Sequence, residues 1–157
     1  MDTKIFYLTK EKLSELKKEY CELVILVRNK AEGEAPKAFE SEDLNPDFVI
    51  FQDDLNFLRS RMTELQNIFD HCEIIKKPAK NKTHIVDMGA KLKLDINGDK
   101  EEFILVGTLE ANPALGKISN ESPVGKALLG HKIGDEVLIS FPVKTIYKIK
   151  SIKYEIG

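Results

Sequence analysis

The sequence predicts a two-domain α+β protein, in which a long antiparallel helical hairpin precedes a small antiparallel β-sheet domain with one short helix. An apolar stripe in the second arm recurs at alternating steps of four and three residues: Leu44, Phe48, Phe51, Leu55, Leu58, Met62, Leu65, Phe69 and Cys72. A mean period of 3.5 is typical of a helix packed along its length against a partner helix. After residue 83 the apolar period changes to two, which is typical of strands.

The partner helix is predicted directly upstream. Its apolar residues repeat at steps of three and four and are prolonged by small residues: Leu13, Leu16, Tyr20, Leu23, Val27, Ala31, Ala35 and Ala38. Thr9 is a good N-cap, so we expect a helix from about Lys10 to about Ala38, about 40 Å long at 1.5 Å per residue. Gly33 and Pro36 interrupt it, and we expect its distal third to be frayed, kinked or ended early.

The second arm has a clear start. Asn45 is a preferred N-cap, Pro46 suits the first helical position, and Asp47 places negative charge at the positive end of the helix dipole. The arm is expected to continue to about Glu73. The hairpin tip between the arms, residues 40–47, is rich in acidic residues.

The domain boundary is expected where the sequence becomes polar, basic and interrupted by proline. We assign residues 1–76 to the coiled coil, 77–83 to a linker and 84–157 to the sheet domain. The apolar segment 5–8, ahead of the Thr9 cap, is expected to pack back on the first helix.

The second domain is predicted to begin with a hairpin, because residues 90–96 alternate at period two and Asn97-Gly98 is a strong type I′ turn. Ser122 as N-cap, Pro123 at the first position and Gly130 at the end predict one short helix. Further strands are expected at 102–107, 137–141 and 145–156. The last of these alternates apolar and mostly basic residues, so one face is expected to be buried and the other to present Lys148, Lys150 and Lys153.

Composition narrows the function classes. The chain has 157 residues and a net charge of −2, which gives no global electrostatic reason to bind nucleic acid or a membrane. It lacks a signal peptide and an apolar run long enough to span a bilayer, so we expect a cytoplasmic protein. We also expect it to be a monomer. Cys21 and Cys72 are expected to be buried or half-buried thiols. The three histidines have no ligand spacing, and we assign no metal site held by this protein alone.

Four segments together resemble the bacterial Gre transcript cleavage factor family: 7–18, 43–44, 61–65 and 116–137. The last is the most specific, because it follows the family's Ser-Pro, Ala-Leu-x-Gly and Gly-Asp-x-Val pattern nearly throughout. The resemblance implies an FKBP-like second domain that docks on RNA polymerase, here assigned to Ser122, Pro123, Gly134 and Asp135. It also implies a coiled coil that reaches down the polymerase's secondary channel.

In that family, acids at the tip help to hold a second Mg²⁺ shared with the polymerase, which then cleaves the 3′ end of backtracked RNA. Asp43 matches the first acid of the family's tip, but Pro46 stands where the second is expected. We assign Asp43 first, Asp47 second and Glu42 third as metal-directed acids, with Glu40 a further possible source of the second carboxylate. The alternative for the tip is an acidic surface loop that is merely solvated. The alternative for the protein is a Gre-like factor that occupies the channel and regulates transcription without stimulating cleavage.

Two other features have competing interpretations. A basic patch could contact the RNA 3′ segment, or its members could be solvated helix positions: Arg28, Lys30, Lys37, Arg59 and Arg61. The sheet domain alone could be a peptidyl-prolyl isomerase or chaperone, although few aromatic residues are present to line a proline pocket. Phe57 lies off the apolar stripe and is expected to be exposed. No nucleophile elbow surrounds Ser122, which argues against an enzyme in its own right.

Overall fold

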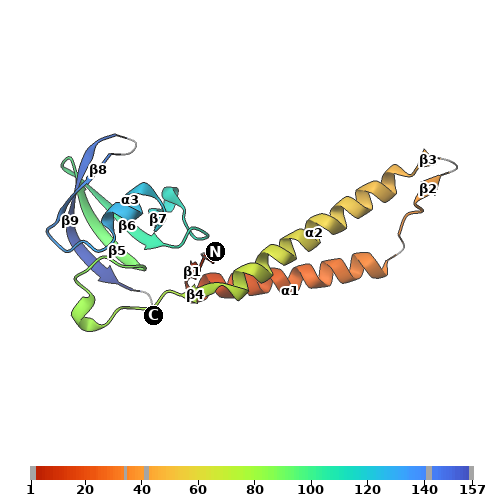
Figure 1. Cartoon of the computed structure of the whole chain (residues 1–157), viewed down its shortest axis with the longest axis horizontal. Helices are drawn as coiled ribbons and strands as arrows, with labels where there is room; N and C mark the ends of the chain where they lie inside the picture. The colour runs from red at the N-terminus through yellow and green to blue at the C-terminus, as the bar shows by residue number, and fades with distance from the viewer. Residues whose placement is uncertain (1–2, 34, 41–42, 141–142, 156–157) are drawn as a thin grey trace. The chain divides into compact units, whose positions relative to one another are not determined.

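The computed structural model describes residues 3–33, 35–40, 43–140 and 143–155 (Figure 1). The chain forms two compact units, one made of residues 11–71 and the other of the N-terminal segment up to Lys10 together with everything from Cys72 onward. The sequence pattern instead places residues 5–8 and the end of the second arm with the coiled coil. No helix in the described ranges is both long enough and apolar enough to cross a bilayer.

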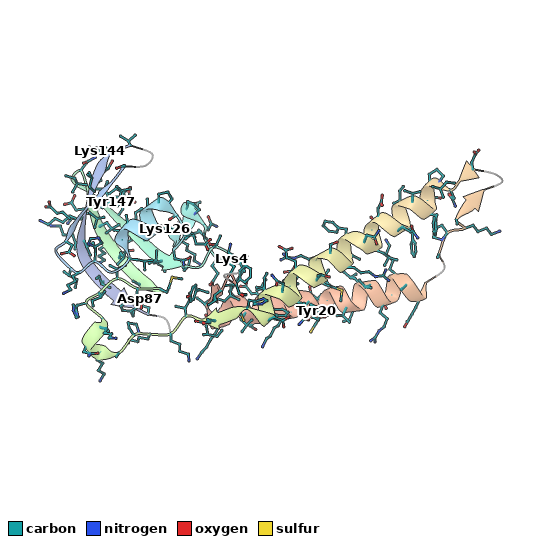
Figure 2. All side chains as sticks on the ribbon, viewed as in Figure 1. Lys4, Tyr20, Asp87, Lys126, Lys144 and Tyr147 are labelled. Atoms are coloured by element: carbon teal, nitrogen blue, oxygen red, sulfur yellow. The ribbon has the colours of Figure 1, made fainter. Side chains whose placement is uncertain are left out.

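The helical unit consists of α1 (Lys10–Glu32) and α2 (Pro46–Asp70), which run antiparallel (Figure 1). The predicted stripes supply most of the packed seam, with Leu16 and Leu23 of α1 and Leu55 and Leu65 of α2 buried. Ile68 is also buried although it lies outside the predicted stripe, whereas Leu44, at the start of that stripe, is 52% exposed. Tyr20, labelled in Figure 2, meets Phe69 edge to face with ring centroids 5.8 Å apart. These contacts confirm the two-helix coiled coil.

The first arm ends earlier than about Ala38. Helix α1 stops at Glu32, directly before Gly33, whose flexibility is costly inside a helix. Ala31 is exposed and does not prolong the seam. Lys30 is partly covered instead, with its ammonium 5.7 Å from the centroid of the Phe51 ring.

The tip contains a short antiparallel ladder of β2 (Phe39–Glu40) and β3 (Asp43–Leu44), rather than a simple loop. The register pairs position 40 with Asp43. Asn45 caps α2 as predicted, because its side chain accepts a hydrogen bond from the Asp47 N–H at 3.1 Å.

The second unit is built on a five-stranded sheet in the order β7-β6-β5-β9-β8. Its strands are β5 (Ala90–Ile96), β6 (Asp99–Val106), β7 (Lys117–Ser119), β8 (Glu136–Ile139) and β9 (Thr145–Tyr154). The predicted turn joins β5 to β6, and Asn97 and Gly98 adopt φ values of 53° and 90°. Strand β7 was not anticipated, and it pairs parallel to β6, so the sheet is not wholly antiparallel.

Strand β9 departs from simple alternation at a β-bulge. Leu94 of β5 pairs with Ile149, whereas the adjacent Lys93 pairs with Ser151, which leaves Lys150 as the extra residue. The bulge shifts the buried face by one position, so Ile149 and Ile152 are both buried although they are three positions apart, a spacing that regular alternation would place on opposite faces. Lys150 and Lys153 are exposed as predicted, but Lys148 is half-buried.

Helix α3 (Pro123–Leu128) packs its buried Leu128 into the core of this unit. The rest of the core comes mainly from the sheet, with Leu92, Leu94, Leu105 and Ile149 almost fully buried, and from Val86 ahead of it. Two short 3₁₀ turns, η1 (Lys80–Lys82) and η2 (Pro113–Leu115), lie outside the sheet. The α+β fold class is therefore confirmed.

The segment 5–8 contains a strand that was not predicted. It forms β1 (Phe6–Leu8), which pairs in parallel with β4 (Cys72–Ile74). A Cβ at position 107 would lie 2.0 Å from the Tyr7 carbonyl oxygen, so only glycine allows this close approach. The Glu110 carboxylate accepts from both the Thr9 N–H (2.9 Å) and its hydroxyl (2.6 Å).

The two cysteines differ from each other. Both are free thiols, and Cys72 is half-buried as expected. Cys21 is exposed, contrary to the prediction, because it lies on the face of α1 that turns away from the seam.

Candidate functional site

The tip positions two of the predicted acids. Asp43 lies in β3 and Asp47 in the first turn of α2, and both are exposed. Asn45, between them, receives the Asp47 N–H on its side chain and donates its Nδ2 to the Lys37 carbonyl oxygen at 2.9 Å. Its own N–H also binds the Ala38 carbonyl oxygen at 2.9 Å. Asn45 therefore holds the two sides of the tip together.

Asp43 and Asp47 present free carboxylates. Across the described ranges, no hydrogen bond or ion pair engages either side chain. Glu42, the third predicted acid, lies outside the described residues. In the part of the chain that the structure describes, no three His, Cys, Asp or Glu side chains gather closely enough to hold a metal ion. Hard carboxylate oxygens fit Mg²⁺, but these two acids offer only part of a coordination shell.

Two of the five cations of the predicted basic patch, Lys30 and Arg61, are engaged by acids. Arg61 binds Glu19 on α1 through two hydrogen bonds of 2.6 and 3.1 Å, and binds Glu64 at 3.0 Å. The hydrogen bond from Arg61 lowers the pKa of the Glu19 carboxyl, and the bonds to both acids raise the pKa of the Arg61 guanidinium. Lys30 binds Asp54 at 3.0 Å.

These ion pairs mark one side of the hairpin, which we call the paired flank. On α2 its residues recur at steps of four, three and four: Ile50, Asp54, Phe57 and Arg61. On α1 the corresponding residues are Glu19, Leu26 and Lys30. Such steps keep side chains on one face of a helix, and the contacts Lys30–Asp54 and Arg61–Glu19 place the two stripes on the same side of the hairpin.

Arg28 and Arg59 lie on the opposite side, which we call the arginine flank. Each is two residues from a member of the paired flank, a step that turns about 200° around a helix. Both are exposed, and no carboxylate of the described ranges forms an ion pair with either guanidinium. The predicted patch is therefore divided: Lys30 and Arg61 are held by acids, whereas Arg28, Arg59 and the exposed Lys37 form no ion pair within the described ranges.

Glu19 and Asp54 were not predicted as partners of these cations. Their positions could have indicated the role, because each lies beside the apolar stripe of its helix, where residues of two packed helices form interhelical ion pairs. Choosing the pairs required the register between α1 and α2. Sequence periodicity alone does not supply that register.

The predicted docking residues of the second unit have structural roles. The Ser122 hydroxyl accepts from the Gly125 N–H at 3.0 Å and donates to the Ser119 carbonyl oxygen at 2.7 Å, and Pro123 starts α3. Gly134 has φ 90°. The hydrogen bond from the Lys132 N–H lowers the pKa of Asp135, and the His131 ring is 3.3 Å away. These roles neither require nor exclude docking.

Comparison with known proteins decides the family. The family model described as "Transcription elongation factor, GreA/GreB, C-term" matches residues 81–154. Transcription elongation factor GreA of Thermomicrobium roseum is 35% identical over 141 residues, which span 88% of this chain and 90% of that protein. The GreA of Thermodesulfovibrio yellowstonii is 38% identical over 154 residues, 94% of this chain and 96% of that protein. This chain belongs to the GreA/GreB family of transcription elongation factors.

Among solved structures, the GreA/GreB factor from Nitrosomonas europaea aligns over 96% of this chain and 99% of its own, with 20% identity and a TM-score of 0.44. GreA/GreB factors are accessory transcription factors rather than enzymes.

Proposed function

We propose that this protein binds RNA polymerase through its secondary channel and stimulates cleavage of the 3′ end of backtracked RNA. The observation that carries the proposal is the placement of free Asp43 and Asp47 carboxylates at the end of a two-helix arm. Membership of the GreA/GreB family supports RNA polymerase as the partner. We propose that it acts in the cytoplasm as a monomer.

Asp43 and Asp47 are the residues of this chain that would help to hold a Mg²⁺ shared with the polymerase. Such an ion stabilises the attacking and leaving oxygens of phosphodiester hydrolysis when it is bound. The contribution of this chain is positional. Asn45 fixes the start of α2 against residues 37 and 38, which keeps Asp47 in the first helical turn.

The arginine flank is proposed to contact the RNA 3′ segment through Arg28 and Arg59. Phosphate binding favours guanidinium groups that are not already neutralised, and these two meet that condition. Lys30 and Arg61, held by Asp54 and Glu19, are no longer proposed as principal RNA contacts. Docking of the second unit is proposed to use the surface around Ser122, Pro123, Gly134 and Asp135.

The alternative function is a channel-bound regulator without cleavage activity. Pro46 favours it, because it stands where the family's second acid is expected and Asp47 is one position further along α2. The two functions differ in whether the tip supplies an effective pair of carboxylates.

Cleavage of a stalled, backtracked elongation complex tests both functions. The wild type is expected to release short 3′ RNA fragments, and Asp43→Asn to reduce the rate on the order of 100-fold, because a charged oxygen ligand is lost. Asp53→Asn is the matched control, since Asp53 is an exposed acid on α2 away from the tip. Binding of the wild type without release of RNA would replace the cleavage proposal with the regulator.

A further inference from the structure

The paired flank combines satisfied charges with large exposed apolar side chains. Phe57 is 75% exposed, Ile50 58% and Leu26 52%. Phe57 lies three residues after Asp54 and four before Arg61, both of which are held in ion pairs. These exposed apolar side chains share one side of the hairpin, and exposed apolar surface of this kind is available to contact another protein.

The charges on this flank argue against a nucleic-acid ligand. Lys30 is bound to Asp54, and Arg61 to both Glu19 and Glu64, so the flank's cations are already neutralised. Binding of phosphates here would have to break these pairs. A neutral, apolar protein surface would leave them intact and would bury Phe57, and aromatic residues dominate the energetics of such contacts.

The size of the patch argues against a second copy of this chain. Three side chains that are half to three-quarters exposed offer on the order of a few hundred Å², whereas a specific, stable interface buries about 800 Å² on each partner. The patch is therefore too small to hold a dimer by itself. It suits a contact within a complex that is anchored elsewhere on the molecule.

We propose that Leu26, Ile50 and Phe57 form a contact surface for an apolar part of the polymerase, packed against one side of the hairpin while it occupies the channel. This inference rests on the proposed function, because it requires the arm to enter the polymerase. Phe57 is the central residue of the contact. The paired flank thus adds affinity and fixes which side of the arm faces the protein wall.

The test measures the affinity of full-length variants for a stalled elongation complex, and separately the cleavage rate at saturating factor. Phe57→Ser is expected to raise Kd about tenfold and to leave the saturated cleavage rate unchanged. Ile25→Ser is the matched control, because Ile25 is 56% exposed but lies about 100° from Leu26 around α1. It is expected to leave Kd within about twofold, since a surface change outside a contact costs little.

The outcomes separate the two proposals. If the wild type binds and cleaves but Phe57→Ser binds the elongation complex with the same Kd, only the proposed contact surface would be overturned. Failure of the wild type to bind polymerase would overturn the proposed function and this inference with it. Because Kd is measured without cleavage, a wild type that binds but does not cleave still tests the contact. A wild-type dimer that Phe57→Ser converts to a monomer would assign the patch to self-association and overturn the proposal.

Discussion

Both flanks of the helical hairpin carry cations, but those of the paired flank are bound by acids and those of the arginine flank are not. On the paired flank, Lys30 and Arg61 each reach a carboxylate on the other helix. On the arginine flank, Arg28 and Arg59 are exposed, and the described residues offer them no ion-pair partner. The same residue type can therefore hold two helices together on one side and remain available to a ligand on the other.

The difference arises from the acids rather than from the cations. Glu19 and Asp54 flank the seam where the partner helix presents a cation, and the arginine flank has no equivalent acid opposite Arg28 or Arg59 within the described ranges. A charged surface on a helical hairpin is thus informative only after the interhelical pairs have been identified. The comparison yields three predictions.

The largest effect is expected from reversing the arginine flank. Arg28→Glu combined with Arg59→Glu should reduce the rate of transcript cleavage about tenfold or more, because two phosphate contacts become repulsive. The dependence of the rate on salt should also become weaker. Cleavage assays over a range of salt concentrations measure both quantities.

Lys80→Glu combined with Lys82→Glu is the control for this reversal. It changes the net charge by the same amount at exposed positions outside the hairpin. Equal losses in the two double variants would show that overall charge, and not the arginine flank, controls the rate.

A smaller effect is expected from breaking the paired flank. Arg61→Met should lower the free energy of unfolding of the hairpin by about 1 kcal/mol, because a two-hydrogen-bond pair with Glu19 is lost from a partly exposed site. Thermal unfolding followed by the helical circular dichroism signal measures this change. Arg59→Met should stay within about 0.5 kcal/mol of the wild type; an equal loss there would contradict the division into two flanks.

The smallest effect concerns pH. The hydrogen bond from Arg61 lowers the pKa of Glu19 below its ordinary value of 4.5. Because the folded-state pKa is the lower one, this pair stabilises the hairpin fully above about pH 4.5, and the contribution is lost as the pH falls through the folded-state pKa. The difference in Tm between wild type and Arg61→Met should therefore be larger at pH 7 than at pH 3. A difference that does not change with pH would indicate that Arg61 contributes by packing.

Much of the fold could be predicted because it depends on neighbours in sequence. The apolar spacing of α2, the Asn45 cap, the Asn97-Gly98 turn and the Ser122 cap each depend on residues within a few positions of one another, and each is present in the structure. The end of α1 was anticipated less accurately. Gly33 could be recognised as a helix breaker, but small alanines beyond it suggested a longer stripe.

Other features depend on residues far apart in the chain and could not be read from local patterns. The parallel pairing of β1 with β4 joins residues 6–8 to 72–74. Glycine is required at position 107 only because the Tyr7 carbonyl oxygen lies too close to leave room for a Cβ there. The bulge at Lys150 reflects the pairing of β9 with β5. In each case the deciding partner is supplied by tertiary structure.

The features of the candidate site can likewise be separated into those that depend on the sequence alone and those that depend on tertiary structure. The sequence by itself determined the kinds of groups available: acids at the tip, cations along both arms, and Phe57 off the apolar seam. Only the tertiary structure decided that Lys30 and Arg61 are neutralised, that Arg28 and Arg59 are free, and that Phe57 shares a side with Leu26 and Ile50. The physical reason is that an ion pair between helices depends on their register and relative rotation, which the packed seam sets collectively along its length.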